Sequence, residues 1–370
     1  MPTLISAGLT SLNKQMQAIQ AAQDLLGELR RHADQHDFTS TFVNVGPFLI
    51  RLKQDSTCAR LSLARAFHPI QNPQSHLTAD LTVYVLRAAK ISIHNFSALL
   101  AQLLSAPPMG LPALADQQKA PLVIIKHPTS RLLKVYDSTS RTALLYIDDP
   151  AVLPSWEHFS PIKEFIHLLA LSQSCLLMHA GSVVNQGLNR SVLLVGPGGS
   201  SKSSLTAFAV SKGMKTNGDD YVLVDNRGAR PKCWSVYRTL KLHPSSPAAE
   251  LTRRFSPWQH DALTQKTIYL ESDAAHDTCF ATQSEITRIY GIRLRGLDPD
   301  KHHGTHAKHE NNPYAYASMS TIQQLPYWVG SMLSLTKQLY ESVGYRALTI
   351  DNGITGMSAA LSSIDAEMNE

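Results

Sequence analysis

A glycine-rich segment in the middle of the chain constrains its fold more than any other feature. The residues from Gly196 to Ser203 read GPGGSSKS, which departs at one position from the phosphate-binding pattern GxxxxGK[ST]. An apolar run at residues 191–195 precedes this segment, and residues 202–212 have the composition of a helix. In such a unit, glycines let backbone amides curl around phosphate oxygens at a helix N-terminus. The order of these elements therefore predicts a phosphate-binding loop in an α/β core.

The residues of this loop have different predicted roles. Lys202 is expected to reach the β and γ phosphates of a nucleoside triphosphate, and Ser203 to place its hydroxyl on Mg²⁺. Further nucleotide contacts are expected from Gly196, Pro197, Gly198, Gly199, Ser200, Ser201 and Ser204. Ser201 stands where the pattern has glycine, so its Cβ is expected to strain the loop by about 1 kcal/mol or more. The alternative is a glycine-serine turn that only joins a strand to a helix.

Two further features lie at matching distances on either side of the loop. His179, within the sequence MHAG, stands seventeen residues before Gly196, and Asp220, the second residue of the pair Asp219-Asp220, stands seventeen residues after Ser203. With the loop, these features resemble the HPr kinase/phosphorylase family, which has a histidine strand motif before its loop and an aspartate pair after the loop helix. The resemblance covers about residues 160 to 245. The β-rich half before it is also similar to HPr-kinase-related proteins of unassigned substrate.

The resemblance implies an α/β fold with a P-loop kinase core of the HPr kinase/PEP carboxykinase-like type. It implies ATP and Mg²⁺ as cofactors, and transfer of the γ phosphate to a hydroxyl of a protein, a peptide or a small molecule. The catalytic residues would be Asp220 as general base, His179 placing the γ phosphate or the acceptor, and Lys202. Asp219 would bind or orient the metal with Ser203, or support Asp220. The family's cores form hexamers, so a homo-oligomer is expected.

One stretch departs from the family pattern. Residues 237–243 contain no glutamate, although family members have a magnesium ligand there. Arg238 and Lys241 are candidates for clamping phosphate, with ordinary strand-surface charges as the alternative. His179 is alternatively a core histidine, and the aspartate pair a solvated turn. A nucleotide-binding module without turnover and a structural or interaction protein therefore stay open as alternative functions.

The remaining pattern predicts two domains, residues 1–155 and residues 156–370. The first is expected to be a β-rich α+β accessory domain, with an amphipathic helix at residues 12–29. Its strands are expected at residues 42–52, 81–86, 123–125 and 144–147. The proline-rich residues 105–120 indicate a loop.

The second domain is predicted to begin with a helix. Ser160 and Pro161 predict its start, with the serine hydroxyl as N-cap, and the helix is expected over residues 160–174. Strands are expected at residues 176–184, 191–195 and 221–225. Gly213 is expected to cap the loop helix, and helical spacing of apolar residues at 328–340 predicts a helix in a C-terminal helical region.

Composition limits the partners and the compartment. The 370 residues include 34 Lys and Arg against 29 Asp and Glu, a formal charge of +5 without a long basic run, so no nucleic acid is expected. No apolar stretch has the length needed to cross a bilayer, so no membrane partner is expected. Four widely separated cysteines and an N-terminus without a signal-peptide pattern favour the cytoplasm.

A histidine cluster has two interpretations. Its members are His302, His303, His306 and His309, with Glu310 beside them. Imidazoles at such spacing can share one zinc or copper ion. The surrounding aspartate, glycine, asparagine and proline residues are typical of a loop. A polar loop that covers the acceptor site is favoured, and a metal site is the alternative.

Overall fold

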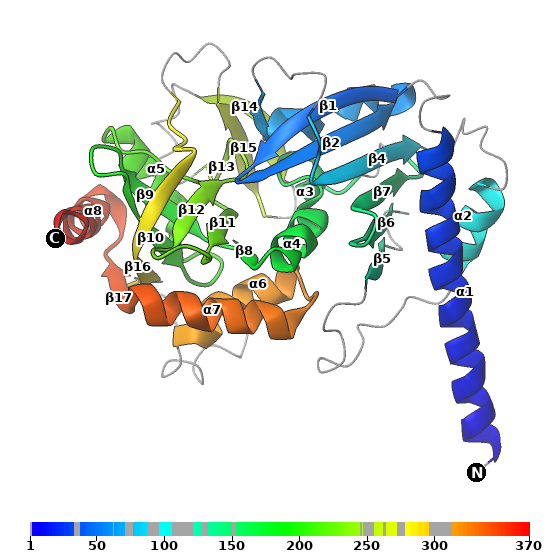
Figure 1. Cartoon of the computed structure of the whole chain (residues 1–370). Helices are drawn as coiled ribbons and strands as arrows, with labels where there is room; N and C mark the ends of the chain where they lie inside the picture. Colours follow the sequence, from blue (N-terminus) through cyan, green and yellow to red (C-terminus); the bar gives the residue numbers. More distant parts are fainter. Residues whose placement is uncertain are drawn as a thin grey trace. The chain divides into compact units, whose positions relative to one another are not determined.

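A computed structural model gives the structure of most of the chain (Figure 1). It describes residues 2–32, 38–61, 63–70, 77–87, 96–105, 121–127, 132–149, 153–244, 246, 255–261, 264–271, 278–295 and 313–370. These residues form a mixed α/β protein with several sheets. They divide into unit 1, of residues 1–44, 48–65 and 69–158, and unit 2, of residues 45–47, 66–68 and 159–370. The main division falls at residue 158, whereas the sequence analysis placed it at residue 155.

A seven-stranded mixed sheet makes up most of unit 1, with the order β3-β1-β2-β4-β7-β6-β5. Its strands are β1 (Phe38–Val45), β2 (Phe48–Asp55), β3 (His68–Pro69), β4 (Leu81–Arg87), β5 (Leu122–His127), β6 (Leu132–Asp137) and β7 (Thr142–Ile147). Strands β2, β4 and β7 are parallel, whereas β5, β6 and β7 form antiparallel pairs. The 3-10 helices η1 (Ser56–Leu61) and η2 (Leu63–Ala66) follow β2.

Two helices cover one face of this sheet. They are α1 (Pro2–His32) and α2 (Phe96–Ser105). Buried residues of α1 recur at helical spacing and pack with Leu103 of α2 and with alternate residues of β4 to β7, such as Leu133 and Leu144. Because one stripe of the helix and one face of the sheet are apolar, their packing buries both from water.

The sequence analysis identified much of unit 1. The helix at residues 12–29 is confirmed within the longer α1, and the last three predicted strands are confirmed as parts of β4, β5 and β7. The prediction of one strand at residues 42–52 is wrong, because the chain turns at Gly46. Gly46 has φ +59°, which glycine adopts without a Cβ clash. Helix α2 and strand β6 were not predicted, and residues 106–120 of the predicted loop lie outside the described residues.

The main sheet of unit 2 has the order β8-β11-β12-β16-β10-β9, and β17 also pairs with β16. Its strands are β8 (Cys175–Met178), β9 (Gly181–Asn185), β10 (Arg190–Val195), β11 (Val222–Asp225), β12 (Lys232–Ser235), β16 (Gln283–Leu294) and β17 (Tyr345–Ile350). A smaller antiparallel sheet contains β13 (Thr239–Leu242), β14 (Phe255–Asp261) and β15 (Lys266–Glu271). The helices are α3 (Trp156–Phe159), which crosses the unit boundary, and α4 (Lys163–Ser172), α5 (Lys202–Ser211), α6 (Pro313–Gln324), α7 (Val329–Val343) and α8 (Gly353–Asn369).

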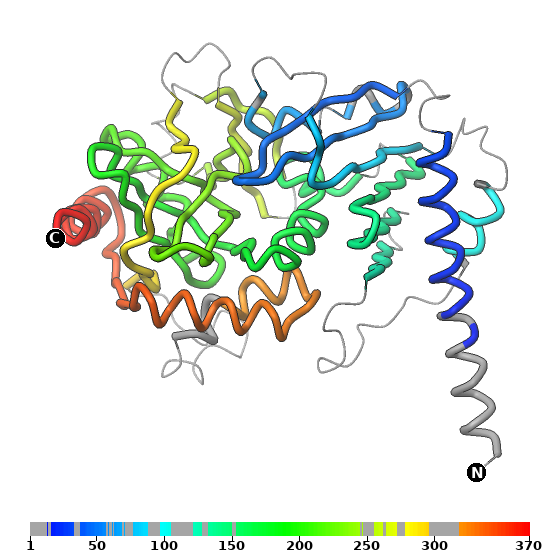
Figure 2. The backbone as a smooth tube through the Cα atoms, in the orientation of Figure 1, coloured from blue at the N-terminus to red at the C-terminus, as the bar shows by residue number. Residues whose placement is uncertain are grey.

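The core of unit 2 fixes the position of the glycine-rich loop. Strands β10 and β16 run parallel and side by side (Figure 2). Leu194 and Ile292 from these strands pack with Leu205 of α5 and Ile364 of α8, and all four are buried. This packing fixes the carboxyl end of β10 and the start of α5, and so it fixes both ends of the glycine-rich loop that joins them.

The main sheet bends back on itself. Strands β8 and β9 are its two edges, yet only His179 and Ala180 separate them in the chain. Three consecutive Cα separations span at most about 11 Å, so the two edges must approach each other at this point. The prediction of one strand at residues 176–184 is therefore wrong, because the chain leaves β11 and joins β10 at this bend.

The predicted start of the first helix is also wrong. Helix α4 begins at Lys163, and Ile162 is its N-cap in a left-handed conformation. The Tyr237 hydroxyl donates to the carbonyl oxygen of Pro161 at 2.9 Å, so that carbonyl has a partner outside the helix. The hydroxyl of Ser160 is buried without capping any backbone group. The left-handed backbone of Ile162, with φ 52°, separates Ser160 and Pro161 from the helix.

Other predictions for unit 2 are confirmed. Gly213 has φ +88°, and the bonds from Gly213 N–H to Val210 and from Met214 N–H to Ala209 close a Schellman cap on α5. The predicted helix at residues 328–340 is α7. None of the described helices has the length and apolar character to span a membrane.

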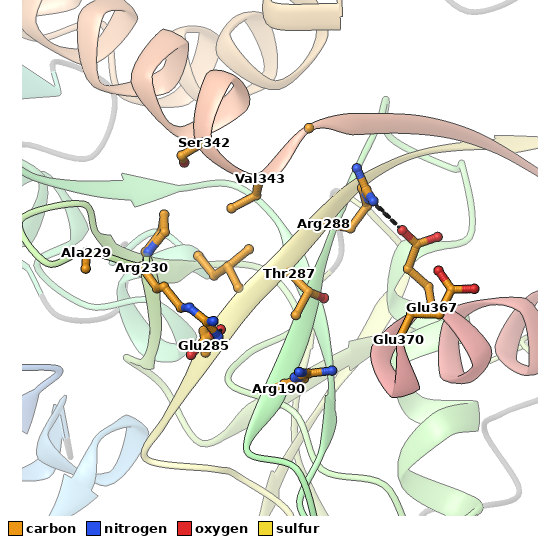
Figure 3. A pocket seen from close by; sticks show the side chains of 13 residues that line it. Arg190, Ala229, Arg230, Glu285, Thr287, Arg288, Ser342, Val343, Glu367 and Glu370 are labelled. Atoms are coloured by element: carbon orange, nitrogen blue, oxygen red, sulfur yellow. Dashed lines mark hydrogen bonds and ion pairs between the residues drawn. The ribbon is translucent and has the colours of Figure 1, made fainter.

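Helix α8 is fastened to the sheet by Glu367. Its carboxylate accepts hydrogen bonds from Nε of Arg288 at 2.7 Å and from the Tyr290 hydroxyl at 3.2 Å, and it also pairs with Arg346. Glu367 and Arg288 border a cavity of about 540 Å³ (Figure 3). These arginines are thus already paired with a buried carboxylate.

Candidate active site

The glycine-rich loop joins the carboxyl end of β10 to the start of α5, where the sequence predicted it. A Cβ on Gly196 would lie 2.8 Å from the carbonyl oxygen of Ile292, so glycine is needed beside β16. A Cβ on Gly198 or Gly199 would instead meet no other atom within 4 Å. The space above these two glycines lets a ligand approach the backbone closely, as phosphate binding requires.

Ser201 adopts the backbone conformation that favours glycine. It is the N-cap of α5, with φ 71° and ψ 17°, and its side chain makes no capping hydrogen bond. A left-handed conformation costs a residue with a Cβ about 1–2 kcal/mol. The strain expected from the sequence at this position is therefore confirmed by the backbone.

Ser201→Gly is expected to raise the free energy of unfolding by about 0.5–1 kcal/mol. Relief of the strain, about 1–2 kcal/mol, exceeds the additional chain entropy that glycine loses on folding. Denaturant unfolding measures the change. Ser211→Gly at the other end of α5 is the control, and it should lower stability because Ser211 has ordinary helical backbone. An equal loss of stability in both variants would mean that Ser201 carries no strain.

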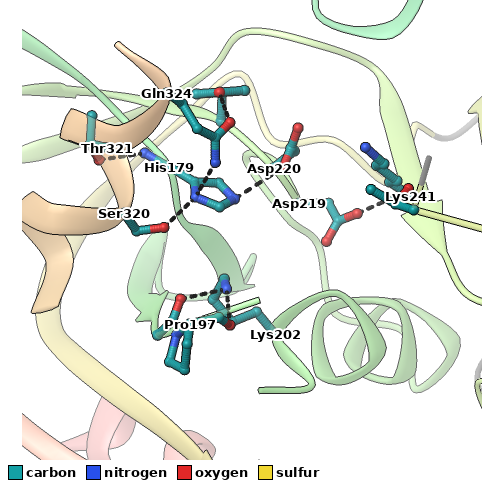
Figure 4. Close-up of polar contacts among 12 residues, drawn as sticks. His179, Pro197, Lys202, Asp219, Asp220, Lys241, Ser320, Thr321 and Gln324 are labelled. Atoms are coloured by element: carbon teal, nitrogen blue, oxygen red, sulfur yellow. Dashed lines mark hydrogen bonds and ion pairs between the residues drawn. The ribbon is translucent and has the colours of Figure 1, made fainter. Parts of the chain in front are cut away.

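Lys202 begins α5 and folds back over the loop. Its Nζ donates to the carbonyl oxygens of Gly196 at 2.7 Å and Pro197 at 3.0 Å (Figure 4). Burial, together with the charge of Lys266, lowers the pKa of Lys202 to about 8. Two neutral carbonyls are weaker partners for an ammonium group than phosphate oxygens, which form charge-assisted hydrogen bonds.

The structure brings Asp219 and Ser203 together. Oδ2 of Asp219 accepts a hydrogen bond from the backbone N–H of Lys241 at 2.7 Å. Oδ1 is buried and accepts no hydrogen bond of normal geometry from the described residues. Burial raises the pKa of Asp219 to about 6, and the nearby Ser203 hydroxyl acts in the opposite direction. A buried carboxylate oxygen without a partner, beside a hydroxyl, fits Mg²⁺, which takes oxygen ligands and few of them from protein.

His179 and Asp220 form a hydrogen-bonded pair. His179 lies at the bend between β8 and β9, and its Nε2 is 3.1 Å from Oδ1 of Asp220. Its Nδ1 is 2.6 Å from Oγ of Ser320 and 2.8 Å from Nε2 of Gln324. Both ring nitrogens therefore have protein partners, so direct contact of His179 with a phosphate or acceptor is not supported. The geometry instead supports a role in holding Asp220.

The surroundings keep this pair in a defined charge state. Burial lowers the pKa of His179 below its ordinary value, so the ring is neutral at pH 7. Burial acts to raise the pKa of Asp220, but the hydrogen bond from His179 and the charges of Lys241 and Lys163 hold it well below its usual range. Asp220 is therefore ionised and able to accept a proton.

Three site residues on α6 were missed from the sequence. Ser320 and Gln324 contact the His179 ring, and Thr321 Oγ1 accepts a hydrogen bond from the His179 backbone N–H at 3.1 Å. They lie more than 140 residues from His179 along the chain. No motif surrounds them, so the sequence carried no signal for this contact.

Two lysines near the carboxylates were also missed. Lys163 of α4 lies 5.5 Å from the centre of the Tyr221 ring, and its charge lowers the pKa of Asp220. Lys266 of β15 lowers the pKa of both Lys202 and Asp219. These cations come from separate elements, and together they favour an anionic ligand at the loop.

The two predicted phosphate clamps have other partners in the structure. Lys241 forms an ion pair with Asp261 at 2.9 Å, although its charge also acts on Asp220. Arg238 is buried, its backbone N–H donates to Ala66, and its charge helps burial to lower the pKa of His68 to about 4. Their role as clamps stays a prediction. The histidine cluster at residues 302–309 lies outside the described residues.

Comparisons with known proteins do not assign the chain to a family. No family model matches the chain, and a search of curated proteins finds no match. A functional assignment therefore rests on the geometry of the site.

Proposed function

We propose that the chain is an ATP-dependent phosphotransferase with a P-loop kinase core of the HPr kinase/PEP carboxykinase-like type. The observation that carries this proposal is the convergence of three separate segments. The glycine-rich loop supplies Lys202. The segment between α5 and β11 supplies Asp219, whose Oδ1 has no hydrogen-bond partner among the described residues. The pair of Asp220 and His179 lies beside them. These are the parts that phosphoryl transfer requires: a phosphate cradle, a metal ligand and a proton acceptor.

Mg²⁺ would be held by Ser203 and Asp219. When bound with ATP, the metal supplies positive charge that offsets the charge on the phosphate oxygens. Residues 237–243 lack the glutamate that ligates magnesium in the HPr kinase family. In this proposal Asp219 takes its place, because its Oδ1 accepts no hydrogen bond from the described residues. The remaining positions would be filled by phosphate oxygens and water.

The residues of the chain have separate roles in the proposed transfer. Lys202 and the loop amides bind the β and γ phosphates, and Asp220 takes the proton of the acceptor hydroxyl. The acceptor oxygen forms a bond to the γ phosphorus. The bond from that phosphorus to the bridging oxygen breaks, and its electron pair leaves with ADP. The acceptor is a hydroxyl of a protein, a peptide or a small molecule, and a cytoplasmic homo-oligomer is part of the same proposal.

The first test is a thermal melt of the protein with Mg²⁺ and ATP. At about a hundred times its dissociation constant, a nucleotide stabilises its protein by about 2.7 kcal/mol. At roughly 2–4 °C per kcal/mol for a domain of 150–250 residues, we expect Tm to rise by about 5–10 °C. Release of labelled phosphate from ATP, and its transfer to serine- and threonine-containing peptides, are followed in parallel.

The controls are Mg²⁺ alone and ATP with a chelator, which should give smaller shifts. Because burial raises the pKa of Asp219 to about 6, its carboxyl is protonated at pH 5. The part of the shift that depends on Mg²⁺ should therefore shrink between pH 7.5 and pH 5. No shift at any pH would contradict the proposal and favour a structural or interaction protein. A shift without phosphate transfer would favour a nucleotide-binding module.

A further inference from the structure

Gln324 ends α6 with its amide group between two other residues of the site (Figure 4). Its Nε2 lies 2.8 Å from Nδ1 of His179, and the Tyr221 hydroxyl donates to its Oε1. Ser320, one turn earlier on α6, contacts the same Nδ1. Helix α6 thus meets the edge of the imidazole ring that faces away from Asp220.

The contacts of the ring determine where its proton lies. A neutral imidazole has one N–H and one bare nitrogen, and an ionised carboxylate only accepts hydrogen bonds. The contact between Nε2 and Asp220 therefore requires the proton on Nε2. Nδ1 is then an acceptor for the NH₂ group of Gln324 at 2.8 Å and for the Ser320 hydroxyl at 2.6 Å. A hydroxyl can donate or accept and so suits either tautomer, whereas the NH₂ group only donates and suits this one.

The orientation of the Gln324 amide is fixed from its other end. The hydroxyl of Tyr221 donates to Oε1, which directs the NH₂ group toward His179. Tyr221 directly follows Asp220 in the chain, and its ring lies 5.6 Å from that of His179. A chain of donors therefore runs from Tyr221 through Gln324 and His179 to Asp220, with each group in one orientation.

We propose that Gln324 is a positioning residue that fixes His179 with its proton on Nε2. This tautomer holds Oδ1 of Asp220, and it leaves Oδ2 to take the proton of the acceptor. The opposite tautomer would face a bare nitrogen toward the carboxylate, and the two lone pairs would repel each other. The tautomer follows from the contacts alone, whereas its link to catalysis rests on the proposed phosphotransfer.

Nitrogen NMR of protein labelled at histidine tests the tautomer without any activity. His179→Gln removes one set of ring signals and so assigns them. In the wild type we expect the proton on Nε2 at pH 7. In Gln324→Glu, a carboxylate oxygen replaces the donor, so Nδ1 gains a proton and the pKa of His179 rises. Gln323→Glu adds the same charge at the neighbouring exposed residue and should leave the ring as in the wild type.

The outcomes separate this inference from the proposed function. A proton on Nδ1 in the wild type, or an unchanged ring in Gln324→Glu, would overturn the inference. If the wild type transfers phosphate, Gln324→Leu should lower kcat on the order of 10²-fold, because the base is misplaced, with KM for ATP unchanged. An unchanged kcat in Gln324→Leu would also overturn it. Failure of the wild type to transfer phosphate would reject the function and leave the NMR result to decide the tautomer.

Discussion

Asp220→Asn is expected to lower phosphate transfer by about 10²–10⁴-fold, while the protein still binds ATP. Asparagine has the same shape, and its Oδ1 can still accept the hydrogen bond from Nε2 of His179. The variant therefore keeps the local structure but loses the group that takes the acceptor's proton. Single-turnover release of labelled phosphate from ATP, to water or to peptides, measures the loss, and the thermal shift with ATP measures binding.

Asp225→Asn provides the matched control for this prediction. Asp225 lies on the strand that follows Asp220 and pairs with Arg227, away from the His179 ring. Replacing the Asp225 carboxylate with an amide should leave the rate of phosphate transfer near that of the wild type. Removal of a negative charge near the phosphates should leave ATP binding by Asp220→Asn equal or tighter. Transfer at the wild-type rate in Asp220→Asn would exclude this residue as the general base. Asp219 would then be the remaining carboxylate candidate for that role.

The part of the site that was predictable from the sequence is the part that is local in the chain. Gly196 to Ser203 needs only a strand before it and a helix after it, and the pairing of β10 with β16 provides the support. The left-handed backbone of Ser201 was also predictable, because the phosphate-binding pattern has glycine there. Local motifs of this kind specify their own backbone.

The contacts that were missed depend on how distant segments pack. The ring of His179 is held by Ser320 and Gln324 of α6, and a single sequence does not show which helix covers a given strand. The bend at Ala180 was missed for a related reason. Residues 176–184 are mostly apolar, with Leu and Met at one end and Val at the other, so only the pairing of β8 with β11 and of β9 with β10 reveals the break.

Lys202→Met is expected to weaken ATP binding by about 10- to 150-fold. A hydrogen bond to a charged group contributes about 1.5–3 kcal/mol, and each 1.4 kcal/mol is a factor of ten. At an ATP concentration that stabilises the wild type by about 2.7 kcal/mol, a hundredfold loss of affinity leaves only about 0.4 kcal/mol. Lys212→Met, at the exposed other end of α5, is the control and should keep the full thermal shift.

The melting temperature of Lys202→Met without nucleotide separates loss of binding from loss of fold. The pKa of Lys202 is about 8, below its ordinary 10.5, so the folded state disfavours the charged form. Below pH 8 the charged lysine therefore costs free energy of folding, and that cost fades as the pH rises through 8 toward 10.5. Methionine keeps the buried stem without the charge, so the variant should melt no lower than the wild type at pH 7. A lower Tm without ATP would mean that Lys202 chiefly holds the loop carbonyls, and an unchanged shift with ATP would remove it from the phosphate site.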